Sequence, residues 1–579
     1  MSNPLFTSIP LPKVSRNTFK LSHSNKYTMT AQKNYPTLIM EGLPGDRNLV
    51  FAECLARALP MVAPVYQSYS ISHHAFFVPM RTLSKNWEQF ITGGKDGTYS
   101  SMLPFTTYGA IYSKILTIKS AYAGTATYGS VTDAYKFAIV KLCDVIRMLD
   151  FAGLSFAYQS VTGNIAPASS TPLSQWSKWA FVQTWLTNNS SYSGCDVPVN
   201  LLPFVAMLKI WDEYYRDENI VDSQIDYIAT LGLDTAIGFQ NISTWTTDEF
   251  CALFMMRPRA WKKDRFTSAL PFTQRGPDVL LPIAGTAPVT FGTSTPSAGS
   301  SVVTGTTDAA GDVGLSISVG GGARDITAAA DFDNATLETT INDFRRAERL
   351  QRWYENSARG GSRLNENTLA HWGVHTPDST LDRAVFLGGV NQPLVISEVE
   401  QNSGTASGTT PQGTLAGKGT SYNSGRLFKH YDSEHGYTIV FTSILQHGDY
   451  MQGTPRVFTR QDRYEYAWPE FANLGEEAIK TRELYTLAGN DEVFGYTPRY
   501  SDYKSMPNEI HGDMRTSLRF WSLPRIFGNK PALNEEFIYN PPSKEAFAVT
   551  SGETDEFVVV TRFAIKSSRL LPFYGVPTI

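Results

Sequence analysis

Two pairs of polar residues have spacings that could support metal binding or acid–base chemistry. His371 and His375, in the segment HWGVH, are four residues apart, which is the spacing of two metal ligands on one face of a helix. Gly373 disfavours that helix, and the glutamate of the corresponding metalloprotease motif is missing. Glu434 and His435 are adjacent, but no nucleophile or orienting residue accompanies them. We therefore expect no catalytic residue, no metal site and no cofactor.

Two further patterns indicate structure rather than chemistry. His73 and His74 are neighbours in a predicted strand, so their side chains face opposite sides of it and cannot share one ligand sphere. The segment GTLAGKGTS is similar to a phosphate-binding loop, but Gln412 stands where that motif needs glycine. Gly419 follows Lys418 where the motif needs serine or threonine. The sequence therefore predicts no ATP site.

The arginine-rich segment 339–366 is a stronger candidate for a functional surface. Ile341 and Phe344 begin the apolar side of a predicted helix, which we expect to end at Gly360 and Gly361, where a positive φ is inexpensive. Acidic residues, including Glu348 four positions before an arginine, dilute the positive charge. This mixture favours an exposed or protein-interface surface over nucleic-acid binding. The candidate subunit-interface residues are Arg345, Arg349, Arg352 and Arg359.

The first forty residues contain five basic side chains and no acidic one, with aromatic residues between them. Cations that follow a phosphate backbone, together with aromatic faces for unpaired bases, are typical of single-strand binding. An arm that is simply solvated explains the composition equally well. The candidate DNA or interior contacts are Lys13, Arg16, Lys20, Lys26 and Lys33, with Phe19 and Tyr27.

The composition limits these interpretations. The chain has 579 residues, with 50 basic and 54 acidic side chains, so its formal charge is −4 and any DNA contact must be local. Its four cysteines have no paired spacing, which favours reduced thiols in a cytosolic setting. The sequence shows no secretory signal and no apolar run near the roughly 20 residues that span a bilayer. We expect a soluble protein made in a cytoplasm, without membrane insertion.

The elements that must position these residues are mainly short strands. Alternating apolar residues predict strands at 69–78, 436–445 and 557–566, and because these lie far apart, the sheet must be assembled from distant segments. An apolar stripe containing Phe204, Leu208, Trp211 and Tyr215 predicts a helix in 201–218. Two stretches rich in Gly, Ser, Thr and Ala, 284–330 and 402–425, are expected to be surface excursions.

Several motifs, taken in order, resemble the major capsid proteins of gokushovirus-like microviruses. They include LPGD at 43–46, FFVPMRTLSKNWEQFITGG at 76–94, IWDEYYRDENI at 210–220 and KDRFTSALPFTQRGPDV at 263–279. The arginine-rich segment, LGGVNQPLVISEV, EHGYTIVFTSI and RYEYAWPEFANLGEEAI follow, and RLLPFYGVP closes the series. Each motif alone is modest, but the resemblance covers nearly the whole chain in the order of the family.

The resemblance implies an all-β fold: an eight-stranded antiparallel jelly-roll β-sandwich with long loop insertions carrying several helices. A basic arm (1–40) would precede one capsid domain (41–579), with insertions at about 95–200, 284–330, 339–366 and 402–425. About sixty copies would assemble in a bacterial cytoplasm into a T=1 icosahedral shell around circular single-stranded DNA. Implied partners are a small basic DNA-associated protein, a pilot or internal scaffolding protein, and a host-cell surface receptor.

An alternative remains at this point: a jelly-roll protein that binds or hydrolyses carbohydrate. Aromatic-rich β-sandwiches often stack sugars, but a hydrolase needs two carboxylates held across one cleft, and the sequence places no such pair. Closed shells would favour the capsid interpretation, and monomers active on polysaccharide would favour the alternative. Within the capsid interpretation, the 284–330 insertion is expected to project from the shell as a small β excursion and to contribute to host attachment.

Overall fold

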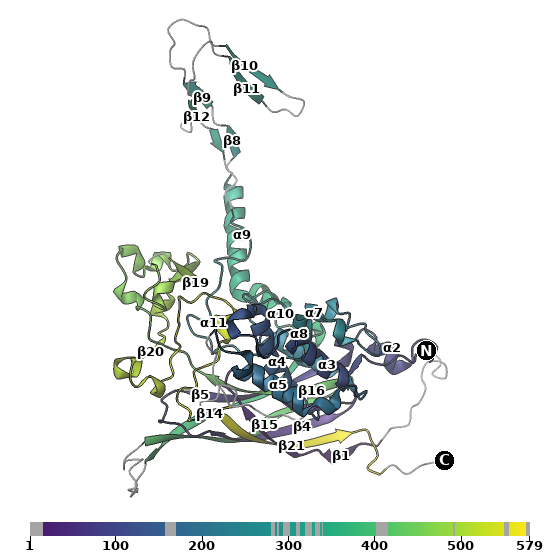
Figure 1. Ribbon diagram of the computed structural model, residues 1–579. Helices are drawn as coiled ribbons and strands as arrows, with labels where there is room; N and C mark the ends of the chain where they lie inside the picture. The colour runs from purple at the N-terminus through teal and green to yellow at the C-terminus, as the bar shows by residue number, and fades with distance from the viewer. Residues whose placement is uncertain are drawn as a thin grey trace. The chain divides into compact units, whose positions relative to one another are not determined.

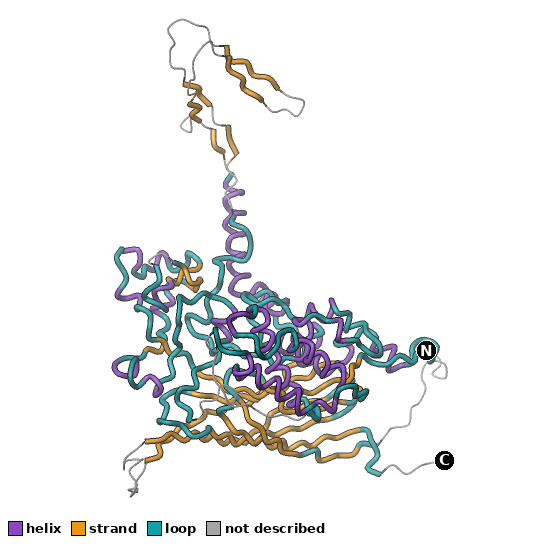
Figure 2. Tube along the Cα trace, in the orientation of Figure 1, coloured by secondary structure: helices purple, strands orange, loops and turns teal. Residues whose placement is uncertain are grey.

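The computed structural model describes residues 15–156, 169–279, 340–400, 415–489, 492–548 and 555–574, and the backbone of six short strands between 284 and 338. The chain divides into two compact units (Figures 1 and 2). The first comprises Met1–Thr273 and Gly360–Ile579, and the second comprises Gln274–Arg359.

One antiparallel sheet of the first unit combines strands from both ends of the chain. Its central strand β21 (Phe557–Arg569) pairs on one side with β1 (Asn17–Lys20) and β2 (His23–Met29). On its other side β21 pairs with β4 (Arg47–Ala58), which in turn pairs with β15 (Leu415–Tyr431). The predicted strand at 557–566 is therefore confirmed, and it lies at the centre of this sheet.

A second set of antiparallel strands continues from the first. The order is β3 (Tyr35–Gly42), β16 (Gly436–Gln446), β5 (Tyr69–Pro79) and β14 (Val385–Glu400). Strand β14 pairs with β5 through residues 385–394 and with β15 through residues 395–400, so it belongs to both sets. The predicted strands at 69–78 and 436–445 are confirmed as β5 and β16.

Burial follows the alternation of the sequence. In β21, every second residue from Phe557 to Ser567 is buried, whereas the residues between them are exposed or half-buried. The buried side of β4 and β21 packs against β3, β5 and β16 through a cluster that includes Val50 and Phe563. In contrast, β16 is buried along nearly its whole length, because helices cover the face of β5 and β16 that is turned away from β4 and β21.

Helices come mostly from the long insertion at 95–200 and the segment that follows it. Their bounds are α3 (Tyr108–Lys119), α4 (Asp133–Phe151), α5 (Ser177–Asn188), α6 (Leu202–Tyr214), α7 (Asp226–Thr230) and α8 (Thr247–Phe254). Helix α6 confirms the apolar stripe, since Phe204, Leu208 and Trp211 are buried and the helix contacts β5 and β16. Thr132 caps α4 and Thr246 caps α8, each accepting a backbone N–H bond.

Shorter elements complete the first unit. The helices are α2 (Trp87–Thr92), α10 (Leu364–Trp372) and α11 (Glu535–Tyr539). Three two-stranded pairs are β6 (Phe105–Thr107) with β7 (Pro198–Asn200), β17 (Asp449–Tyr450) with β20 (Asn508–Glu509), and β18 (Glu476–Lys480) with β19 (Val493–Pro498). The pair β17 and β20 is parallel, whereas the large sheet at the core of this unit is antiparallel throughout.

The second unit contains helix α9 (Ile341–Gly360) and three nested pairs of short strands. β8 (Ala284–Thr286) pairs with β13 (Thr336–Glu338), β9 (Val289–Gly292) with β12 (Thr327–Ala330), and β10 (Val302–Thr307) with β11 (Val313–Ser318). Two expectations are confirmed: the 284–330 insertion contains a small β structure, and the arginine-rich helix ends at Gly360.

The other low-complexity stretch differs from the expectation. Residues 401–414 lie outside the described residues, but 415–425 belong to β15, between β4 and β14. Its glycines permit close packing: a Cβ at Gly417 would stand 2.7 Å from the carbonyl oxygen of Ala63, and one at Gly419 would stand 2.8 Å from the Cβ of Ala58. A composition typical of a loop therefore serves a strand that other segments approach closely.

Candidate functional site

The two histidines considered as metal ligands do not share a helix. His371 lies in α10, which ends at Trp372, and Gly373 follows in the left-handed conformation with φ of 69°. His375 lies beyond that cap. Across the described part of the chain, no group of three or more His, Cys, Asp or Glu side chains is arranged to hold a metal ion.

His73 and His74 are parts of the packing of β5. The Nδ1 atom of His73 lies 2.8 Å from the hydroxyl of Thr442, and Nδ1 of His74 lies 3.0 Å from the hydroxyl of Tyr215. Burial lowers the pKa of His73 to about 4. Burial, followed by the charge of Arg259, lowers the pKa of His74 to about 3. Both rings are therefore neutral at pH 7, and their environment is structural.

The remaining chemical candidates are also occupied by structural contacts. Glu434 accepts a 2.8 Å hydrogen bond from Nε of Arg81, and the ring of His435 packs edge-on against Trp87. Gly417, Lys418 and Gly419 lie within strand β15 rather than in a loop before a helix, which is the context a phosphate-binding motif requires.

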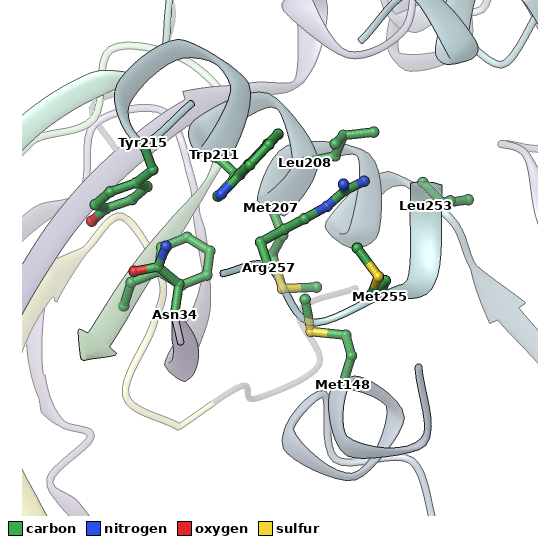
Figure 3. A pocket seen from close by; sticks show the side chains of 10 residues that line it. Asn34, Met148, Met207, Leu208, Trp211, Tyr215, Leu253, Met255 and Arg257 are labelled. Carbon is green, nitrogen blue, oxygen red and sulfur yellow. The ribbon is translucent and has the colours of Figure 1, made fainter. Parts of the chain in front are cut away.

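The cavities do not resemble a hydrolytic cleft. A cavity of about 10 Å³ beside α6 is lined by Met148, Met207, Trp211 and Arg257, and has room for one water molecule at most (Figure 3). A cavity of about 700 Å³ is lined by residues between 450 and 515 together with Arg265 and Phe266. Two of its carboxylates, Glu483 and Asp502, form ion pairs with the largely buried Arg265 and Arg460. These two carboxylates are thus held in ion pairs with buried arginines.

The basic candidates of the N-terminal arm lie in different environments. Lys13 lies outside the described residues. Nη1 of Arg16 donates one hydrogen bond to the carbonyl of Gly45 and a second, 2.9 Å long, to the carbonyl of Ser568. Lys20 in β1 and Lys26 in β2 are exposed, whereas Lys33 forms an ion pair with Asp144 of α4. Of the four described cations, Lys20 and Lys26 are therefore the exposed ones, in the edge strands β1 and β2.

The aromatic candidates of the arm pack within the first unit. The ring of Phe19 stacks on Phe573, with 5.7 Å between the centroids and 7° between the planes. The hydroxyl of Tyr27 lies 2.8 Å from that of Thr561, and burial raises the pKa of this phenol. Phe19 thus packs β1 against the segment that follows β21, and Tyr27 packs β2 against β21.

The arginine helix exposes its charged residues. Arg345, Arg349, Arg352 and Arg359 of α9 are all exposed, as are Ile341 and Phe344 on the same helix. The side chains of Ile341 and Trp353 are 72% and 49% exposed, so apolar surface accompanies the arginines. A helix surface of this kind is typical of contact with another protein.

The described residues contain no helix with the length and apolarity needed to cross a membrane.

The comparisons with known proteins agree on one family. The profile of the family described as capsid protein (F protein) matches residues 7–136 and 161–579. Capsid protein VP1 of Chlamydia phage 1 is 28% identical, over 99% of this chain and 97% of the relative.

Two more relatives carry the same description. Capsid protein VP1 of Bdellovibrio phage phiMH2K is 29% identical, over 99% of this chain and 97% of its own length. Capsid protein VP1 of Spiroplasma virus 4 is 31% identical, over 66% of this chain and 73% of its own length. The chain therefore belongs to the capsid protein (F protein) family, as a structural, non-enzymatic protein of a phage virion.

Proposed function

We propose that about sixty copies of this chain close into an icosahedral shell around circular single-stranded DNA. The observation that carries the proposal is the strand pairing. The eight long strands of the sheet are β2, β3, β4, β5, β14, β15, β16 and β21. If they are numbered 1 to 8 in this order, β2, β21, β4 and β15 pair in the order 1-8-3-6. The strands β3, β16, β5 and β14 pair in the order 2-7-4-5. This pairing supports an eight-stranded jelly roll, a fold that manages its sheet edges by forming a double sheet and is found in viral shells.

Exposed apolar side chains support assembly through large interfaces. In the first unit, Phe458, Leu487 and Met506 are 80%, 84% and 92% exposed. Exposed apolar side chains of this size are available for burial by a partner, and obligate interfaces commonly bury more than roughly 2,000 Å². The exposed arginines of α9 provide further interface residues, because arginine binds carboxylates and carbonyls with a fixed fork of donors.

The proposed partners are inferred from a difference in charge, because the chain is nearly neutral and the DNA inside the proposed shell is a polyanion. A formal charge of −4 over the whole chain cannot neutralise a genome. A small basic DNA-associated protein, together with a pilot or internal scaffolding protein, supplies the remaining charge and directs assembly in the bacterial cytoplasm. The basic arm 1–40 faces the interior of the shell, and the second unit contributes to contact with a host-cell receptor.

Electron microscopy of negatively stained material tests the proposal directly. The chain is expressed with and without the implied partner proteins, and closed particles of uniform size are expected. A monodisperse monomer at high concentration in both preparations would overturn the proposal.

A further inference from the structure

The face of the β2–β21–β4–β15 sheet that is turned away from β5 and β16 carries an unusual concentration of positive charge. On β21, Arg562 and Lys566 are exposed, and on the adjacent β4, Arg47 and Arg57 are exposed. The register places all four on one face, since Val558 lies opposite Arg57 and Ser568 lies opposite Arg47. Glu53 of β4 shares this face and forms a 3.3 Å ion pair with Arg562.

The neighbouring strands extend this face on both sides. β15 adds Lys418, Arg426 and Lys429, all exposed, with Arg426 opposite Phe51 and Lys429 opposite Leu49. β1 and β2 add Lys20 and Lys26, the exposed cations of the N-terminal arm. We call the exposed face of β1, β2, β21, β4 and β15 the basic sheet face.

The charge of this face contrasts with that of the whole chain. Its nine lysines and arginines and the single Glu53 give a formal charge of +8. The whole chain carries −4, so the remainder carries −12. A separation of this size produces a strong local positive potential on a protein that is acidic elsewhere, and it favours an anionic polymer as the occupant.

Two lysines of the basic sheet face stand directly opposite each other. The register pairs Lys20 of β1 with Lys566 of β21, and Lys566 also pairs with Leu49, which pairs with Lys429. Like charges opposite each other on adjacent strands are destabilising. One row across four strands thus carries three lysines, an arrangement that a bound polyanion would stabilise.

Exposed aromatic rings lie among these cations. Tyr422, opposite Leu55, is 69% exposed, and Tyr431, opposite Arg47, is 54% exposed. The guanidinium of Arg47 lies 6.0 Å from the ring centroid of Tyr431. Phe51, between Ala564 and Arg426, is 39% exposed. Rings of this kind can stack on unpaired bases, whereas the stacked bases of a duplex are not accessible to them.

We infer that the basic sheet face binds single-stranded nucleic acid, with phosphates on its lysines and arginines and bases on Tyr422 and Tyr431. The inference rests on the proposed shell, because it makes this face the interior surface that contacts the genome. It assigns the contact to five strands that are distant in sequence, of which the arm supplies only two cations. In Figure 1, β21, β4 and β15 lie on the side of the first unit that is opposite the helices α3, α4 and α5.

Binding of a fluorescent single-stranded oligonucleotide of mixed sequence tests the inference on the full-length chain, at concentrations below those at which shells form. For single strands, the logarithm of the binding constant falls with the logarithm of salt concentration by about 0.7 per neutralised phosphate. The double variant Lys429→Gln/Lys566→Gln is therefore expected to reduce this slope by about 1.4. The matched control, Lys85→Gln/Lys95→Gln, removes two exposed lysines elsewhere and should leave the slope unchanged.

The stacking contribution is measured separately. Tyr422→Ala is expected to weaken binding about tenfold without changing the salt slope, because it removes a stacking ring and no charge. Tyr464→Ala, which removes a 51% exposed ring outside this face, should bind as the unchanged protein does. An unchanged slope in the double lysine variant would overturn the inference. So would tighter binding to poly-glutamate or to anionic lipid vesicles than to the oligonucleotide.

The DNA content of purified particles separates this inference from the proposed function. Shells of Lys429→Gln/Lys566→Gln are expected to close and to contain less DNA than shells of the control pair. Closed shells with unchanged DNA content would overturn the inference and leave the proposed function standing. Failure of the unsubstituted chain to form shells would overturn the proposed function, while the oligonucleotide measurement would still decide whether the face binds nucleic acid.

Discussion

Asp432 and Asp46 are two fully buried carboxylic residues whose backbones are joined, since the N–H of Asp432 donates to the carbonyl of Asp46 over 2.9 Å. Nε of Arg569 lies 3.1 Å from Oδ2 of Asp46 and compensates its charge. The carboxyl of Asp432 instead accepts from Asn48 over 2.8 Å and lies 3.4 Å from the ring of His430. Burial, followed by the charge of Asp46, raises the pKa of Asp432 to about 7.

This pair predicts a stability that decreases as pH rises. The folded chain holds the proton of Asp432 up to about pH 7, whereas the unfolded chain releases it near pH 4. Between these values the folded state binds more protons, so stability falls by at most about 1.4 kcal/mol per pH unit and levels off above pH 7. Asp432→Asn should flatten this slope in urea unfolding at pH 5.0 and pH 7.5. An unchanged slope would contradict the assignment to Asp432.

The ion pair between Arg147 and Asp555 predicts a large effect on stability. Nη1 of Arg147 in α4 lies 2.6 Å from Oδ1 of Asp555, and both side chains are less than a tenth exposed. Asp555 also accepts from the hydroxyl of Thr28, so the pair connects α4, β2 and the start of β21. Arg147→Leu should cost about 3–5 kcal/mol of unfolding free energy, because it leaves a buried charge unpaired.

A surface pair provides the control for that measurement. Arg519 and Glu545 are also within hydrogen-bonding distance, at 2.7 Å, but their side chains are 41% and 43% exposed. Arg519→Leu should therefore cost at most about 1 kcal/mol. Equal losses in the two variants would show that burial does not set the cost of breaking the Arg147 pair.

Alanine at Arg345, Arg349 and Arg352 is expected to impair shell assembly with little change in the melting temperature. These side chains are exposed on α9, so their removal leaves no unpaired charge in the isolated subunit. In an assembled interface, truncation of a buried charge can cost about 2–5 kcal/mol. Sedimentation of shells and subunits measures the effect. Normal assembly with loss of retained DNA would instead support a nucleic-acid role for this helix.

Replacement of residues 284–338 by a short Gly/Ser linker should leave assembly intact and reduce adsorption to the host. The six strands of this segment pair only with one another, so the replacement removes both members of each pair and no strand of the first unit. Particle counts and adsorption assays measure the two outcomes. Loss of closed shells would show that the segment is architectural.

Trypsin should not reach Lys13–Lys33 in intact particles, if the arm faces the interior. Cleavage there is expected only after particles are opened, and Lys20 and Lys26 should be cut slowly even then, because β1 and β2 are paired with β21. Mass spectrometry of the digests identifies the cut sites. Rapid cleavage with shells still closed would place the arm outside.

Much of the strand content was predictable, because in half-buried strands such as β21 the buried positions recur at every second residue and most of them are apolar. β15 was not predictable, since Gly417, Gly419 and Gly425 resemble a loop, and only the close neighbours of Gly417 and Gly419 show why glycine is needed at those two positions. The sequence predicted nucleic-acid contacts only in the arm, where Lys20 and Lys26 lie close together in the chain. The other cations of the basic sheet face come from β4, β15 and β21, and only strand register brings them to one surface.

The position of β21 also determines when this protein can finish folding. β21 inserts between β2 and β4, whose sequences precede it by about 500 residues, as the pairs Asn25↔Thr561 and Cys54↔Thr561 show. The ribosome therefore releases β4 long before its neighbour exists, and at ~5–20 residues per second the delay is tens of seconds to minutes. Throughout that time the nascent chain has an open sheet edge, which favours chaperone binding and delays competence to join other copies until synthesis ends.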